Sequence, residues 1–216
     1  MARSNTGDAR TITHSMTTRH LDLGCGPCPR NPYGCDEVHA VDLTAPDGME
    51  ARLFRQANLS LEPIPHPDSS FDSISAFDFL EHVPRVLGTA DGRGTRFPFV
   101  ELMNQIHRVL KPAGRLYALT PAFPRPEAFA DPTHVNIITE QTWRYFCGAE
   151  PMGRMYGFAG QFEMLQNDWA LYPEAFVPGA TLATLSWRRR YRRWRLNRSG
   201  RLSHLKWEFA CVKPPA

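Results

Sequence analysis

The chain has few cysteines and no long apolar segment. Its five cysteines are odd in number and scattered over 216 residues, so they do not suggest the paired framework of a disulfide-stabilised secreted domain. No apolar run approaches the roughly 18 residues that a membrane span needs. The segment from Met1 to His20 is polar and lacks the apolar centre of a signal peptide. These absences predict a cytoplasmic protein with reduced thiols.

Acidic side chains are missing from residues 187–206. This segment contains nine of the 25 basic residues and no aspartate or glutamate, which leaves 16 basic against 22 acidic residues elsewhere. The formal net charge of +3 therefore originates in one short stretch. Within it Trp187, Tyr191 and Trp194 recur at helical spacing, so a helix would carry an aromatic stripe flanked by arginines.

Three interpretations of this basic segment remain open. The helix could pack its aromatic stripe on the domain and leave its arginines in solvent, as most charged runs do. It could lie on an anionic membrane surface and hold the protein at the inner membrane face. It could instead bind RNA, where arginines and stacked aromatic rings also serve, although the acidic balance of the remaining chain disfavours a nucleic acid partner.

The most informative stretch runs from Leu21 to Gly26 and reads Leu-Asp-Leu-Gly-Cys-Gly. An apolar strand that breaks into a glycine turn lets a ligand approach bare backbone. Sixteen residues after Gly26 comes Asp42, at the end of a second apolar strand, where a carboxylate can accept hydrogen bonds from a ribose. This combination predicts a nucleotide site at the carboxyl edge of a parallel sheet.

These residues resemble the nucleoside-binding motif of the class I S-adenosylmethionine (SAM)-dependent methyltransferases, and the similarity continues over residues 18–120. Phe79-Leu80-Glu81-His82-Val83 and His107 to Leu116 are similar to later motifs of the same family. A dinucleotide dehydrogenase would normally show a third glycine where this chain has Cys28. The resemblance implies SAM as the cofactor. The residues expected to bind it are Asp22, Gly24, Cys25, Gly26, Asp42, Leu43, Asn58, Leu59 and Phe77.

The expected fold is α/β, a doubly wound Rossmann-like sheet of seven strands whose last two strands are antiparallel. Strands are predicted near 19–23, 37–42, 53–58, 72–77, 115–120, 161–170 and 205–213, with the clearest helix near 98–110. One domain should span residues 1–216, with a flexible leader at 1–17 and a long basic hairpin insertion at 171–204. The prolines between Pro27 and Asp36 predict a short or late first helix.

Catalysis in this family needs an aligned acceptor and often a proton acceptor beside it. Asp131-Pro132-Thr133-His134-Val135-Asn136 follows the fifth strand and resembles a stretch of bacterial methyltransferases. His134 is the leading candidate for the base, with Asp131 close enough in sequence to orient it or to bind the acceptor. His82 is a further candidate, although the family frequently has Glu-His here in members with different substrates, which favours the architecture of the cofactor site over a dedicated base.

No metal site is predicted. Cys25 and Cys28 have the spacing of zinc ligands, but no second pair follows and Cys25 lies inside the glycine turn. The spacing of Asp78, Glu81, Asp131 and His134 allows a divalent ion without demanding one.

The sequence thus favours a SAM-dependent methyltransferase that O-methylates a sugar, a glycolipid or another small hydroxylated acceptor, with a bacterial surface glycan as the preferred class by resemblance only. An RNA methyltransferase and a non-catalytic SAM-binding regulatory protein are the alternatives.

Overall fold

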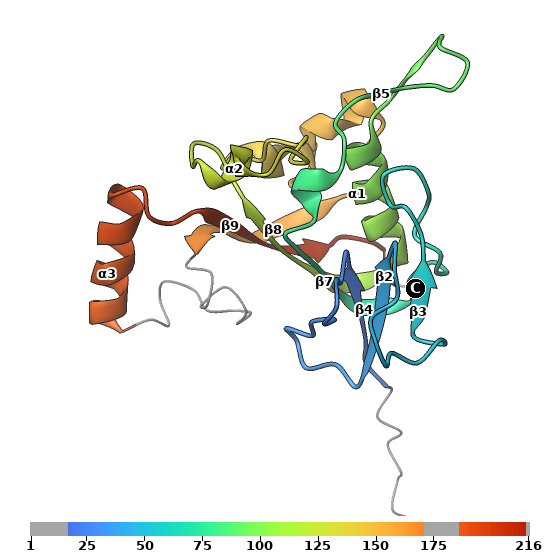
Figure 1. Ribbon diagram of the computed structural model, residues 1–216, viewed down its shortest axis with the longest axis horizontal. Coiled ribbons are helices and arrows are strands. Elements are labelled where there is room, and N and C mark those ends of the chain that lie inside the picture. The colour runs from blue at the N-terminus through green and yellow to red at the C-terminus, as the bar shows by residue number, and fades with distance from the viewer. Residues whose placement is uncertain (1–16, 171–185, 215–216) are drawn as a thin grey trace, which may run out of the picture.

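The computed structural model describes residues 17–170 and 186–214. The predicted leader, except for Thr17, and the first fifteen residues of the predicted insertion, 171–185, lie outside the described residues. A seven-stranded sheet runs through the molecule in the order β3-β2-β1-β4-β7-β9-β8 (Figure 1). Its strands are β1 (Arg19–Leu23), β2 (Glu37–Asp42), β3 (Phe54–Gln56), β4 (Phe71–Phe77), β7 (Leu110–Pro121), β8 (Phe162–Ala170) and β9 (His204–Cys211).

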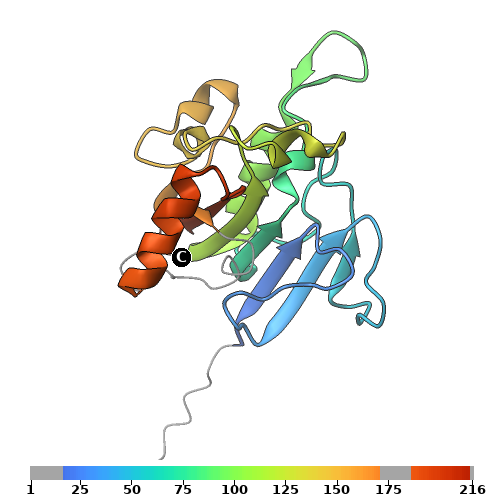
Figure 2. The same cartoon turned by 60° about the vertical axis from the view of Figure 1, so that its left-hand side comes forward.

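Shorter elements surround this sheet. They are the hairpin β5 (Leu87–Gly88) and β6 (Thr95–Arg96), the helices α1 (Pro98–Val109), α2 (Glu127–Ala130) and α3 (Trp187–Arg198), and the 3₁₀ turns η1 (Leu80–His82), η2 (Thr142–Tyr145) and η3 (Met152–Tyr156). In both views α3 lies beyond β8 and β9, at the opposite end of the sheet from β3 (Figures 1 and 2). No helix in the described part of the chain is long and apolar enough to cross a membrane.

The strand directions confirm the predicted methyltransferase-like sheet. β1, β2, β3, β4 and β7 are mutually parallel, whereas β9 is antiparallel to both β7 and β8. β8 therefore runs in the same direction as the first five strands. The chain moves outward from β1 to β3 and then reverses to β4, so the switch point of the sheet lies between the neighbouring ends of β1 and β4, which is where ligands bind in this architecture.

The buried residues of β7 alternate between the two faces of the sheet, and the buried residues of α1 recur with the helical period. Leu116 and Ala118 face the large apolar cluster, which also holds the buried positions of α1, whereas Tyr117 and Leu119 belong to a small cluster on the second face. The α1 positions in that core are Phe99, Leu102, Met103, Ile106 and Val109. An amphipathic helix buries one stripe on a sheet in this way, so α1 fixes the β4–β7 crossover.

Two local predictions need correction. No helix forms between β1 and β2, where residues 24–36 contain only turns and irregular structure, because four prolines or glycines punctuate the span from Pro27 to Gly34. The fifth parallel strand begins at Leu110 rather than near residue 115, but between Leu110 and Arg115 it bulges out of the register with β4. Ala113 has φ = +60° in this bulge, so the Pro-Ala-Gly sequence turns the backbone locally without ending the strand.

Candidate active site

A cavity of about 410 Å³ opens at the carboxyl ends of β1, β2 and β4. It is lined by Gly24, Gly26, Val41, Asp42, Leu43, Ala57, Asn58, Leu59, Ser60, Asp78, Phe79 and His82. Six of the nine residues predicted to bind the cofactor are in this lining: Gly24, Gly26, Asp42, Leu43, Asn58 and Leu59. The structure therefore brings most of the predicted binding residues together around one space at the switch point.

The glycine turn after β1 is shaped by its lack of side chains. Gly24 has φ = +63°, and a Cβ atom built on it would lie 2.4 Å from Cδ2 of Phe79. Gly26 has φ = +56°, but a Cβ there would meet nothing within 4 Å. Both residues need a conformation that glycine adopts readily, and Gly24 also needs the room in which Phe79 packs. This packing brings the loop after β4 against the loop after β1.

Asp42 holds the same turn from the end of β2. Its Oδ2 accepts a hydrogen bond from the backbone N–H of Gly26 at 2.8 Å, and its Oδ1 accepts one from that of Leu43 at 2.6 Å. An ionised carboxylate has about four acceptor positions, so each oxygen retains capacity for a further donor. Asp42 can therefore brace the glycine turn and still accept from ribose hydroxyls.

A buried polar network lies beneath the cavity. Asp22 is 1 % exposed, accepts from the backbone N–H of Arg30 at 2.8 Å and accepts from the hydroxyl of Ser75 at 2.5 Å. The His20 ring continues the network by hydrogen bonding to Ser75 and Ser73, both at 2.7 Å. Burial raises the pKa of Asp22 to about 6 and lowers that of His20 to about 4. Asp22 thus anchors the loop after β1 from below and does not line the cavity.

Two other predicted binding residues also lie outside the lining. Cys25 is 3 % exposed, and burial raises the pKa of its thiol to about 12. Phe77 belongs to the small cluster on the second face of the sheet, with Tyr117, and the Arg30 guanidinium lies 4.7 Å from its ring centroid. The aromatic residue that does line the cavity is Phe79, two positions further along.

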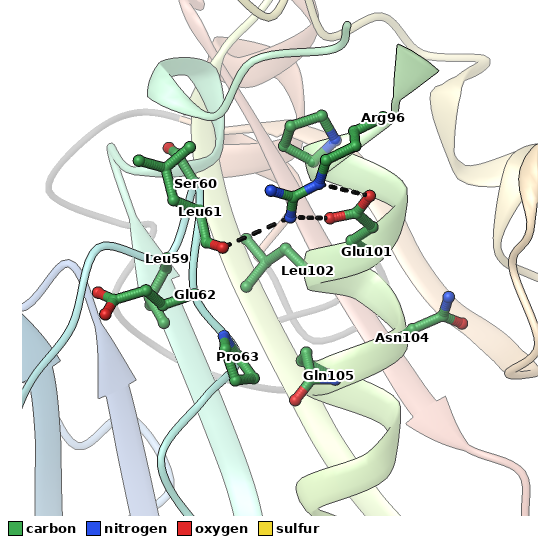
Figure 3. Close-up of a pocket in the computed structure, with 11 residues that line it drawn as sticks. Leu59, Ser60, Leu61, Glu62, Pro63, Arg96, Glu101, Leu102, Asn104 and Gln105 are labelled. Atoms are coloured by element: carbon green, nitrogen blue, oxygen red, sulfur yellow. Dashed lines mark hydrogen bonds and ion pairs between the residues drawn. The ribbon is translucent and has the colours of Figure 1, made fainter. Parts of the chain in front are cut away.

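The turn after β3 forms another wall of the cavity. Asn58 Oδ1 accepts from the backbone N–H of Ser60 at 3.1 Å, and Glu62 accepts from the N–H of Asn58 at 2.6 Å. A second cavity of about 260 Å³ lies between this turn and α1 (Figure 3), where Arg96 pairs with Glu101 and also reaches the carbonyl of Leu61. The contacts in the second cavity attach residues 59–63 to α1 and fix the turn that lines the first.

The segment from Asp131 to Asn136 is fastened over η1. The backbone N–H groups of Val135 and Asn136 both donate to the carbonyl of Glu81 at 2.9 Å, and the Asn136 side chain donates to the carbonyl of Leu80 at 2.9 Å. Arg85 in turn donates to Asn136 Oδ1 at 2.8 Å. These bonds explain how a loop about fifty residues downstream reaches the end of β4 and places its histidine beside Glu81 and His82.

A hydrogen-bonded relay determines which nitrogen of His82 carries a proton. The Thr133 hydroxyl lies 2.6 Å from Asp131 Oδ1 and 3.0 Å from His82 Nδ1. The hydrogen bonds from Thr133 lower the pKa of Asp131, whose ionised carboxylate can only accept. Thr133 has a single hydroxyl proton, which it donates to Asp131, so it accepts from Nδ1–H of His82. Neutral His82 therefore carries its lone pair on Nε2.

His134 lies against Glu81 rather than against Asp131. Its Nε2 is 4.0 Å from Glu81 Oε1, and its ring meets the His82 ring edge to face with centroids 4.9 Å apart. Glu81 is buried, and burial raises its pKa to about 8, so the carboxyl is largely protonated at neutral pH. The Thr120 hydroxyl donates to Glu81 Oε2 at 2.9 Å. Asp131, predicted to orient His134 or bind the acceptor, acts in the structure on Thr133 and through it on His82.

Glu81, His82 and His134 form the one group of potential metal ligands found among residues 17–170 and 186–214. One ligand atom from each lies within 4.8 Å of the others. A carboxylate with two imidazoles suits divalent transition metals. Cys25 and Cys28, which have the spacing of zinc ligands, are not part of this group, and Cys28 is exposed whereas Cys25 is buried. Of the three residues, His82 lines the cavity between β1 and β4, whereas Glu81 is 1 % exposed.

Sequence reasoning missed Phe79 and Thr133. Gly24 is the residue that indicates a ring at this place, because a glycine without a side chain leaves room for an aromatic residue such as Phe79 from another loop. Thr133 stands two residues after Asp131, the spacing at which an aspartate side chain commonly bonds a nearby backbone N–H and hydroxyl. That local pattern indicates a turn, but only the tertiary contact with His82 gives the hydroxyl its further role.

Comparison with known proteins agrees with this architecture. A family model described as a methyltransferase domain matches residues 21–118. The chain is similar to a chain in the complex between the Haloferax volcanii Trm112 methyltransferase activator and a methyltransferase, with 15% identity, a TM-score of 0.52, and coverage of 91% of this chain and 84% of that one. No match was found among curated proteins.

Two further solved structures are similar at lower TM-score. A SAM-dependent methyltransferase from Archaeoglobus fulgidus has 16% identity and a TM-score of 0.49, covering 90% of this chain and 86% of that chain. Phosphoethanolamine N-methyltransferase 2 from Haemonchus contortus, in complex with SAM, has 17% identity and a TM-score of 0.49, covering 91% of this chain and 49% of that chain.

Proposed function

We propose which acceptor this chain methylates and which residue acts as the base. The chain belongs to the class I SAM-dependent methyltransferases and uses SAM as its cofactor. The chain transfers the methyl group to a hydroxyl oxygen of a small acceptor, such as a sugar or the head group of a glycolipid. His82 takes the hydroxyl proton. The observation that carries this proposal is the Asp131–Thr133–His82 relay at the rim of the cavity between β1 and β4.

SAM supplies an electrophilic methyl carbon on a sulfonium, and the products are a methyl ether and the neutral thioether. On the protein side, Asp42, the glycine turn and the turn at Asn58 bind and orient the cofactor. His82 Nε2 accepts the proton of the acceptor hydroxyl as the new carbon–oxygen bond forms. Asp131 and Thr133 hold the ring in the tautomer that leaves Nε2 free to do so, and Asp131 offsets the positive charge that the imidazolium acquires.

His134 and Glu81 complete the acceptor side in this proposal. His134 packs against the His82 ring and keeps it in place, while protonated Glu81 can donate a hydrogen bond to an acceptor oxygen. A hydroxylated acceptor suits this arrangement, because it offers one proton to a base and lone pairs to a carboxyl donor. An amine acceptor would arrive protonated at neutral pH and would have to lose a proton before it could react.

The relay can be tested at Thr133. Thr133→Val is nearly isosteric but removes the hydroxyl, so kcat should fall roughly tenfold to a hundredfold at saturating SAM, with its pH profile displaced. Thr133→Ser keeps the hydroxyl and should restore most of the activity. Equal kcat values and equal pH profiles in the two variants would contradict the relay.

The acceptor class can be tested by incubating the protein with tritiated methyl-SAM and a cell lysate, then separating glycan, lipid, RNA and protein. Label in the glycan or lipid fraction supports the proposal, whereas label in RNA would favour an RNA methyltransferase. SAM binding without turnover on any fraction would favour a regulatory protein.

A further inference from the structure

The helix α3 carries its aromatic stripe on the outside of the molecule. Trp187, Tyr191 and Trp194 are 72 %, 58 % and 55 % exposed. Most of the stripe therefore does not pack on the domain in the way that the first interpretation of the basic segment supposes, although Trp194 lines a cavity of about 220 Å³ together with Asp168 and Trp169.

Other residues of α3 attach it to the domain. Leu196 packs against the main core, and the Arg193 guanidinium reaches the carbonyl of Trp169 and lies 3.9 Å from Asp168. Arg125 donates to the carbonyl of Asn197 at 3.1 Å. With 3.6 residues per turn, position 196 lies roughly opposite the line through the three aromatic residues, and position 193 lies about a third of a turn from it. The attachment thus fixes which face of the helix is turned to solvent.

The outward face combines these rings with cations. Seven of the twelve residues of α3 are arginines, and none is acidic. The Arg188 and Arg198 guanidinium groups lie 5.4 Å and 5.6 Å from the ring centroids of Trp187 and Trp194. Such a surface is complementary to a partner that is anionic and also accepts amphipathic rings.

We propose that α3 docks the protein on an anionic lipid bilayer, with its aromatic stripe at the level of the lipid head groups and its arginines on their phosphates. Tryptophan, tyrosine and arginine favour the membrane interface because their apolar parts enter it while their polar groups stay hydrated or paired. The docking is independent of the acceptor proposed above.

The ring contacts favour a bilayer over RNA. Tyr191 and Trp194 stack on each other with centroids 5.8 Å apart and planes inclined by 29°, and arginines cover faces of both tryptophans. Base recognition by stacking needs free ring faces. Insertion between lipid head groups needs only a compact amphipathic surface, which these contacts preserve.

Docking through α3 would place the cavity beside the membrane. β9 begins six residues after α3 ends, and its first residue, His204, lies 3.2 Å from the Asp78 carboxylate. Asp78 lines the cavity between β1 and β4. An acceptor carried in the same leaflet would therefore meet the cavity without leaving the surface.

The test is co-sedimentation of the full-length protein with phosphatidylcholine vesicles prepared with and without phosphatidylglycerol. Binding should need phosphatidylglycerol and should weaken as salt is raised, because salt screens the attraction. Replacing Arg188, Arg192 and Arg195 by glutamine should lower the partition coefficient by about a hundredfold, since each surface cation contributes roughly fivefold.

A matched control removes three exposed arginines from the other end of the molecule. Arg52→Gln, Arg55→Gln and Arg93→Gln together change the net charge by the same amount, but they should change partitioning only severalfold. Equal losses in the two triple variants would overturn the proposal, because net charge rather than α3 would then govern binding.

Tryptophan fluorescence supplies a second readout. Of the five tryptophans, Trp187 and Trp194 are strongly exposed, whereas Trp169 and Trp207 are buried. Vesicles with brominated acyl chains should quench the wild type and should quench much less in Trp187→Phe/Trp194→Phe. Equal quenching in that variant, no binding to anionic vesicles, or arginine-dependent binding to RNA alone would each overturn the proposal.

Discussion

The closest packing in the candidate site is between Gly24 and Phe79, and it yields the sharpest stability prediction. An alanine Cβ at position 24 would lie 2.4, 2.6 and 2.9 Å from Cδ2, Cγ and Cβ of Phe79. Since the Cβ of Phe79 is bound to its backbone, rotation of the ring alone cannot relieve all three contacts. Gly24→Ala therefore has to displace the loop after β4 or the turn after β1.

Gly26→Ala is the matched control for this change. Both glycines have positive φ, so each alanine incurs the left-handed penalty of about 1–2 kcal/mol, partly offset by a gain of about 0.4–1 kcal/mol from the stiffer unfolded chain. Only position 24 adds the steric conflict, and overpacking of this kind costs about 1–3 kcal/mol. We expect Gly26→Ala to lower the free energy of unfolding by about 1 kcal/mol and Gly24→Ala by about 2–4 kcal/mol.

Equilibrium urea unfolding measures both free energies. Calorimetry measures SAM affinity, which should fall at least about tenfold in Gly24→Ala because the displaced Phe79 lines the cavity. The double variant Gly24→Ala/Phe79→Ala removes the conflict. It should be less destabilised than the sum of its two single changes, because residues in contact are not additive. Equal losses at positions 24 and 26, or simple additivity in the double variant, would refute this reasoning.

Three further outcomes follow from the geometry. Asp42→Ala should weaken SAM binding at least about tenfold by calorimetry, since it removes a charged acceptor, and unchanged affinity in a folded variant would remove Asp42 from the cofactor site. His82→Gln should lower kcat by about 10²–10⁴ in a methyl-transfer assay at saturating SAM, more than His134→Gln does, and the reverse order would make His134 the base. Glu81 has a pKa of about 8 in the folded protein against 4.5 ordinarily, so its stabilising effect is complete below pH 4.5 and is lost as the pH rises to 8. Urea unfolding of wild type and Glu81→Gln should therefore show the wild type losing stability relative to the variant over this interval, and a constant difference would contradict the raised pKa.

The sequence by itself determined the sheet and the edge at which the cavity opens. Strand periodicity, the helical period of residues 98–109 and the glycine turn before Asp42 are local signals, and each depends on neighbouring residues only. They were sufficient to predict the strand positions, whereas the antiparallel final pair and the six predicted residues of the cavity lining came from the resemblance to the class I methyltransferases. The sequence misplaced the start of the fifth parallel strand, because the turn at residues 111–114 became a bulge within the strand.

The tertiary structure decided the contacts between segments far apart in the chain. Asp131 bonds to Thr133 and, through it, to His82, about fifty residues earlier, and no spacing in the sequence encodes that pairing. The exposure of Trp187, Tyr191 and Trp194 could not be predicted either, because helical spacing shows that three rings share a face but not which way the face points. That direction is set by the attachment of Leu196 and Arg193 to the domain, a physical constraint that exists only in the folded chain.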